Sequence, residues 1–192
     1  MKRFPAVMAV FCVLGAGAGL LVLKHGRGPV PVKTVTTTMT GTVQLHIPDD
    51  SAKRTLLDNV DKYVDAPEGV VNWHVLGATK EIPAKSKDYS YMKPEFPDAL
   101  EKLDGKQITI KGFMFPLGEN KDQTLFLFGP FPVSCPFHYH VTPSLTVEVH
   151  ADRNPVGFSY DPIVLNGRLQ LVRDDPDNGV FYRLMEARKV SD

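Results

Sequence analysis

Residues 106–116 read KQITIKGFMFP, and apolar residues alternate with polar ones in the first half of this stretch. A period of two predicts a strand with one face in the core. Turn-forming sequences rich in Gly, Asn, Asp and Pro separate it from four further strand candidates, 124–128, 145–149, 163–172 and 180–185. Five short antiparallel strands predict a β-rich (α+β) domain, either a small barrel of OB type or a compact sandwich. Gly112 and Gly167 lie inside strands, and we expect them at bulges or sharp corners.

One or two short helices are expected before the strands. Asp49, Asp50 and Ser51 are good N-cap residues, and apolar residues follow at helical spacing as far as Val64, which predicts a helix over 51–64. Pro97 suits a first helical position and Gly105 a C-terminal cap, which predicts a second helix over 97–103. The apolar run 70–76 is too short to be assigned as a helix.

Composition excludes several classes of protein. The 192 residues carry 22 basic and 22 acidic side chains, and zero net charge argues against a nucleic-acid binder that relies on a positive field. The only two cysteines, Cys12 and Cys135, lie far apart in the sequence and form neither a disulfide framework nor a CxxC redox motif. The chain is long enough to form one domain with a hydrophobic core.

The first 24 residues predict an exported protein. Lys2 and Arg3 precede an uncharged, mostly apolar run, 4–23, which is typical of a signal peptide or a membrane anchor. Because the apolar stretch continues past the small residues 16–18, we expect an uncleaved span over 1–24, and a cleaved signal is the alternative. The globular part would then lie at the periplasmic face of the inner membrane, or be soluble in the periplasm after cleavage.

The segment 25–48 contains Pro and a Thr-rich patch without helical period, and it reads as a tether. The globular domain is expected over 49–192.

The best candidate for a chemical site is the segment that contains Cys135, His138 and His140. Cys135 is the single cysteine of the expected globular domain, on the side of the membrane where thiols oxidise. Two histidines two apart on a strand face the same way, and a kink at Pro136 would bring the thiolate to them. One thiolate and two imidazoles suit Zn(II) or copper and leave a fourth position open. We therefore expect a metal site at Cys135, His138 and His140.

Two other readings of this segment stay open. In the first, Cys135 is a buried core residue of a non-catalytic scaffold that binds a protein or a glycan. In the second, Cys135 is the reactive thiol of a redox protein, with His138 as its neighbour. Elsewhere, His74 beside Trp73 reads as a half-buried side chain, and the acidic turn 174–178 as a solvated turn rather than a calcium loop. Motifs of the common enzyme classes are absent from the sequence, so we expect no catalytic residues.

Eight segments follow one another over most of residues 73–187: 73–76, 103–106, 112–117, 126–127, 135–138, 147–149, 162–167 and 182–184. In this fixed order they resemble the bacterial envelope family known as domain of unknown function 3299 (DUF3299). The resemblance implies an exported or lipid-anchored domain with a Cys and a nearby His in its central motif. It also implies association with metal-responsive transport systems, and hence an accessory or chaperone-like role beside an envelope metal transporter. This chain departs from the family pattern in carrying His140 where many relatives have a proline-rich run.

Overall fold

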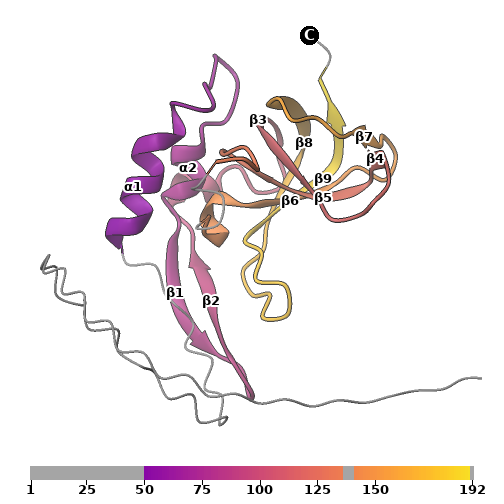
Figure 1. Ribbon diagram of the computed structural model, residues 1–192. Coiled ribbons are helices and arrows are strands. Elements are labelled where there is room, and N and C mark those ends of the chain that lie inside the picture. Colours follow the sequence, from indigo (N-terminus) through magenta and orange to yellow (C-terminus); the bar gives the residue numbers. More distant parts are fainter. Residues whose placement is uncertain (1–49, 136–140, 191–192) are drawn as a thin grey trace, which may run out of the picture. The chain divides into compact units, whose positions relative to one another are not determined.

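A closed barrel of five strands forms the centre of the described part of the chain (Figure 1). The structure is a computed structural model, and it describes residues 50–135 and 141–190. The strands pair in the order β3-β5-β6-β9-β8. Their bounds are β3 Gln107–Pro116, β5 Leu125–Gly129, β6 Val147–His150, β8 Ile163–Leu171 and β9 Tyr182–Lys189. The predicted β-rich class and the barrel are confirmed, and the alternative of a sandwich is wrong.

One strand pair of the barrel differs from the prediction. Strand β6 pairs with β9 in parallel, with Glu148 opposite Arg183, and the other four pairs are antiparallel. Five strands cannot close a barrel in strictly alternating directions, because an odd number leaves two like-directed strands adjacent. The expectation of an entirely antiparallel barrel is therefore wrong at this one junction.

Two glycines allow the strands to bend and change partners. Strand β3 pairs with β8 up to Gly112 and with β5 from Phe113 onward. A Cβ at Gly112 would lie 2.7 Å from the carbonyl oxygen of Gly129, so only glycine fits there without a shift of the backbone. The pairing of β8 with β9 shifts register between Asn166 and Arg168, which places Gly167 at a bulge. The predicted bulge is confirmed at Gly167, and Gly112 lies where β3 changes its partner strand.

Short helices pack beside the barrel. The chain forms α1 (Asp50–Val60), α2 (Trp73–Gly77) and α3 (Asp98–Glu101), and the 3-10 turn η2 (Pro143–Leu145) precedes β6. Helix α1 confirms the predicted helix and ends four residues earlier, and α3 confirms the second one. Helix α2 was missed because its apolar run is short, but the Asn72 side chain accepts the His74 amide and caps it.

Helix α2 closes one end of the barrel. Its Trp73 is 2% exposed and donates its indole N–H to the carbonyl of Lys111 on β3 at 2.7 Å. Tyr182 at the start of β9 is fully buried, and its hydroxyl donates to the carbonyl of Leu76 at 2.8 Å. These contacts fix the helix against two strands that are far apart in the sequence.

Two small sheets were not predicted. Strands β1 (Lys80–Lys85) and β2 (Ser90–Glu95) form a hairpin, and β4 (Asp122–Gln123) pairs with β7 (Val156–Gly157). Figure 1 shows the hairpin beside the loop that joins β8 to β9. Tyr91 and Lys93 of the hairpin both bind the carboxylate of Asp174 in that loop, at 2.8 and 2.7 Å.

The predicted segments 1–24 and 25–48 lie outside the described residues. Within residues 50–135 and 141–190, no helix has the length and apolar character to cross a bilayer.

Candidate functional site

Cys135 is buried next to aromatic side chains. It is 4% exposed, and its backbone N–H donates to the carbonyl of Pro132 at 2.9 Å. The Tyr63 ring packs edge-on against Phe131, with ring centroids 5.4 Å apart. A hydrogen bond with Cys135, together with burial, raises the pKa of the Tyr63 hydroxyl. Burial of Cys135 agrees with the interpretation that it is a core residue of a non-catalytic scaffold.

The other two ligands of the predicted metal site lie outside the described residues. His138 and His140 lie in the segment 136–140, outside the described residues. The described residues contain no group of three or more His, Cys, Asp or Glu side chains that could hold a metal ion. The ligand set of Cys135, His138 and His140 stays a prediction.

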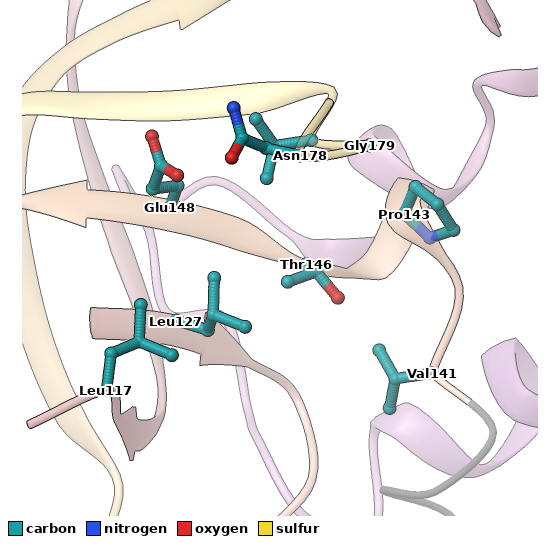
Figure 2. Close-up of a pocket in the computed structure, with 9 residues that line it drawn as sticks. Leu117, Leu127, Val141, Pro143, Thr146, Glu148, Asn178 and Gly179 are labelled. Carbon is teal, nitrogen blue, oxygen red and sulfur yellow. The ribbon is translucent and has the colours of Figure 1, made fainter. Parts of the chain in front are cut away.

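A groove of about 330 Å³ lies on the outer face of β5 and β6 (Figure 2). Two loops and the turn before β6 complete its walls: the loop 117–124 after β3 and the loop 172–181 between β8 and β9. The apolar lining comes from Leu117, Leu127, Val141, Pro143 and Val180, and the rest from Thr146, Glu148, Asn178 and Gly179. Because residues alternate along a strand, Leu127 and Glu148 face outward while Phe126 and Val149 fill the barrel.

Charged hydrogen bonds fix the loop 172–181 against the barrel. Arg183 on β9 donates its Nε to Glu148 Oε1 at 2.7 Å and its Nη2 to Asp175 Oδ2 at 2.5 Å. Asp175 also accepts the backbone N–H of Asn178 at 3.0 Å. Arg183 thus connects strand β6, which carries Glu148, with the loop 172–181, which forms one rim of the groove.

Both carboxylates of this network are ionised at neutral pH. Burial alone would raise the pKa of Glu148, but hydrogen bonds and charge from Arg183 and His150 outweigh it and hold that pKa below its usual value. For Asp175, burial is likewise outweighed by hydrogen bonds from Asn178 and Arg183, and the pKa is lowered. The groove therefore carries a fixed negative charge at Glu148.

Hydrogen bonds also position the opposite end of the groove. The hydroxyl of Ser144 is fully buried and donates to Glu81 Oε1 at 2.6 Å, and Thr142 and Ser144 are bonded through their hydroxyls at 2.8 Å. These bonds join the turn that carries Val141 and Pro143 to strand β1. Figure 2 shows both residues at the side of the groove away from Glu148.

Sequence reasoning did not single out the groove residues. The sequence predicts a solvated turn over 174–178, and the antiparallel pairing of β8 with β9 shows that this turn joins the two strands of a hairpin. Leu127 gave no specific signal, because single apolar residues at outward positions of a strand are common, and Leu125 on the same register lies outside the groove. His74 is half-buried as expected, with its Nε2 3.2 Å from Asp61.

Comparison with known proteins identifies the family without identifying an activity. A DUF3299 family protein from Pseudomonas aeruginosa PAO1 has a solved structure with 20% identity, and the match covers 51% of this chain and 68% of that one with a TM-score of 0.37. No curated protein matches the chain. The family model described as "Protein of unknown function (DUF3299)" matches residues 46–192, so the chain belongs to the DUF3299 family.

Proposed function

We propose that the chain is a non-catalytic recognition module built on a barrel of OB type. Such barrels bind extended ligands on the face of their second and third strands, between the loop after strand one and the loop between strands four and five. Here those parts are β5, β6, the loop 117–124 and the loop 172–181, and they supply six of the nine residues that line the groove. The other three, Val141, Pro143 and Thr146, come from the turn before β6. The coincidence of the groove with this face is the observation that carries the proposal.

The chemistry of the lining also supports recognition rather than catalysis. The nine lining residues offer one hydroxyl, one carboxylate and one amide, and the Thr146 hydroxyl donates to the carbonyl of Thr142 at 3.2 Å. A predominantly apolar cleft with a few fixed polar groups is typical of a ligand site. The proposed ligand is either a segment of a protein or a glycan.

The proposal is tested by NMR on the methyl groups of the full chain, labelled on Leu and Val. The probes are short capped peptides and chitohexaose. We expect at least one probe class to shift the Leu127 and Val180 methyl signals, and Leu127→Arg to abolish that response. Leu125→Arg is the matched control, since Leu125 lies on the same strand and the same register, is 40% exposed and is outside the groove. Methyl signals that no probe moves, or a response that survives Leu127→Arg, would contradict the proposal.

A second candidate function is binding of Zn(II) or copper by Cys135, His138 and His140, as an accessory of an envelope metal transporter. Cys135 is the single cysteine of the family-matched region, and it directly precedes the segment with both histidines. The hydrogen bond between Tyr63 and Cys135 would orient the sulfur of a bound thiolate, as outer hydrogen bonds orient metal ligands.

Metal analysis of the full chain separates this candidate from the scaffold reading. After loading with zinc and desalting under reducing conditions, we expect one zinc ion per chain in the wild type and in the control Cys12→Ser. Cys135→Ser and His138→Ala should lose it. Equal zinc content in all four proteins would contradict metal binding at Cys135.

We further propose that the module lies at the periplasmic face of the inner membrane. The support is the basic start and apolar run within residues 1–24. A reporter enzyme that is active only in the periplasm, fused after residue 192, should be active, and activity only with a cytoplasmic reporter would refute this location.

A further inference from the structure

We infer that the groove binds a peptide segment in which a basic side chain is flanked by apolar ones. This inference rests on the proposed function and names the ligand class. It begins with the acceptors at the groove's polar end. Both hydrogen bonds that Glu148 accepts, from Arg183 at 2.7 Å and from His150 at 2.8 Å, end on Oε1. Neither of these two bonds, which both come from described residues, ends on the other carboxylate oxygen, Oε2. Glu148 is half-buried and lines the groove.

Asn178 adds a second acceptor. Its side-chain N–H groups donate to the carboxylate of Asp175 at 3.1 and 3.3 Å, which leaves its carbonyl oxygen turned to other partners. Figure 2 shows the polar ends of Glu148 and Asn178 at the same end of the groove. Two oxygen acceptors beside an apolar floor suit a ligand that brings N–H donors and apolar side chains together.

The charges around this end are negative in sum. Four carboxylates, those of Glu148, Asp174, Asp175 and Asp177, face two permanent cations, Arg183 and Lys93, and the imidazole of His150, so the sum is negative even with His150 protonated. The remaining cation of the loop, Arg173, is paired with Asp104 and Glu101 instead. A field of this sign attracts a lysine or arginine side chain and repels phosphate groups.

The lining argues against the two other ligand classes that OB barrels commonly bind. Single-stranded nucleic acids are bound by cations along the backbone and by aromatic rings under the bases, and sugar rings also stack on aromatic side chains. None of the nine described lining residues is aromatic or positively charged. The apolar residues Leu117, Leu127 and Val180 instead suit aliphatic side chains.

The test uses the full chain and three capped peptides that differ at one position. In each, valine and leucine flank a central residue and serines end the peptide, and the central residue is lysine, norleucine or glutamate. We expect the lysine peptide to bind about tenfold more tightly than the norleucine peptide, since a charge-assisted hydrogen bond supplies that factor. The glutamate peptide should bind weakest, and the preference for lysine should shrink as salt is raised.

Two variants locate the effect. Glu148→Gln should bring the affinity ratio of the lysine and norleucine peptides, measured within the same protein, close to one, whereas Leu127→Ser should weaken both peptides. Glu186→Gln is the matched control, because Glu186 lies on β9 with a 55% exposed side chain and is outside the groove. Since the salt dependence is measured on the wild type, the inference is tested even if Glu148→Gln does not fold.

The possible failures are distinguishable. Equal binding of the lysine and norleucine peptides, both weakened by Leu127→Ser, would overturn the basic ligand and leave the groove's recognition role standing. Binding of chitohexaose or oligo-dT that depends on Leu127 would overturn the peptide class alone. If no ligand shows dependence on Leu127, the proposed function fails as well.

Discussion

Replacing Arg183 by Met should destabilise the domain and loosen the rim of its groove. Methionine keeps most of the aliphatic stem of arginine but removes the guanidinium that binds Glu148 at 2.7 Å and Asp175 at 2.5 Å. Both carboxylates lie near the surface yet largely covered, with side chains 14% and 11% exposed. Water can replace the lost partner only in part, so each carboxylate loses stabilisation in the folded state.

The size of the effect follows from these two bonds. A hydrogen bond between charged groups contributes about 1.5–3 kcal/mol, and the retained His150 and Asn178 contacts reduce the loss at each carboxylate. We expect the free energy of unfolding to fall by about 2–3 kcal/mol at pH 7. In a domain of this size that loss corresponds to a fall in Tm of about 6 °C.

The effect should depend on pH with a defined sign. The pKa values of Glu148 and Asp175 are lowered in the folded state. A lowered pKa contributes stability that is present above the unfolded value, about 4, and is lost as the pH falls through the folded value. The difference between wild type and Arg183→Met should therefore be largest at neutral pH and shrink below about pH 4.

Urea unfolding at pH 7 and pH 3.5 measures both quantities. The single tryptophan, Trp73, is 2% exposed and reports unfolding through its fluorescence. The matched control is Arg168→Met, because Arg168 pairs with Glu186 at 3.9 Å while both side chains are well exposed, and it should change stability by less than about 0.5 kcal/mol. If Arg183→Met were no more destabilising than this control at pH 7, or its effect did not shrink in acid, the assigned role of the network would be refuted.

Three further substitutions test the core around the barrel, each by thermal and urea unfolding. Tyr182→Phe should cost about 1–3 kcal/mol, because it leaves the buried Thr79 hydroxyl without its 2.6 Å partner, and an unchanged stability would contradict that bond. Gly167→Ala should cost about 1–3 kcal/mol, because its Cβ would lie 2.8 Å from Leu184 Cγ, and a neutral result would show that the bulge can relax. Trp73→Phe should cost about 2 kcal/mol through the lost indole hydrogen bond and ring contacts, and a loss below 0.5 kcal/mol would argue against α2 as a fixed closure of the barrel.

The sequence predicts a β-rich domain, as a barrel or a sandwich, because its strands carry strong local signals. Alternation along β3 and β8 and the acidic turn between β8 and β9 are all readable within ten residues. The hairpin of β1 and β2 has no comparable signal. Its burial alternates weakly, and both strands contain a proline, which is unfavourable in strands. Its position depends on Tyr91 and Lys93 binding Asp174, 81 or more residues away in the sequence.

The site was harder to predict for a related reason. Cys135, His138 and His140 are close in the sequence and attract attention as a motif. The groove instead draws its lining from the loop after β3, from β5, from β6 and the turn before it, and from the loop before β9. Nothing local in Leu117 or Val180 indicates that they meet. Only the closure of the barrel brings them together, and closing five strands requires a parallel pair, which in this fold is β6 and β9. That pair sets Glu148 opposite Arg183, so the same constraint that closes the barrel also fixes the charge at the end of the groove.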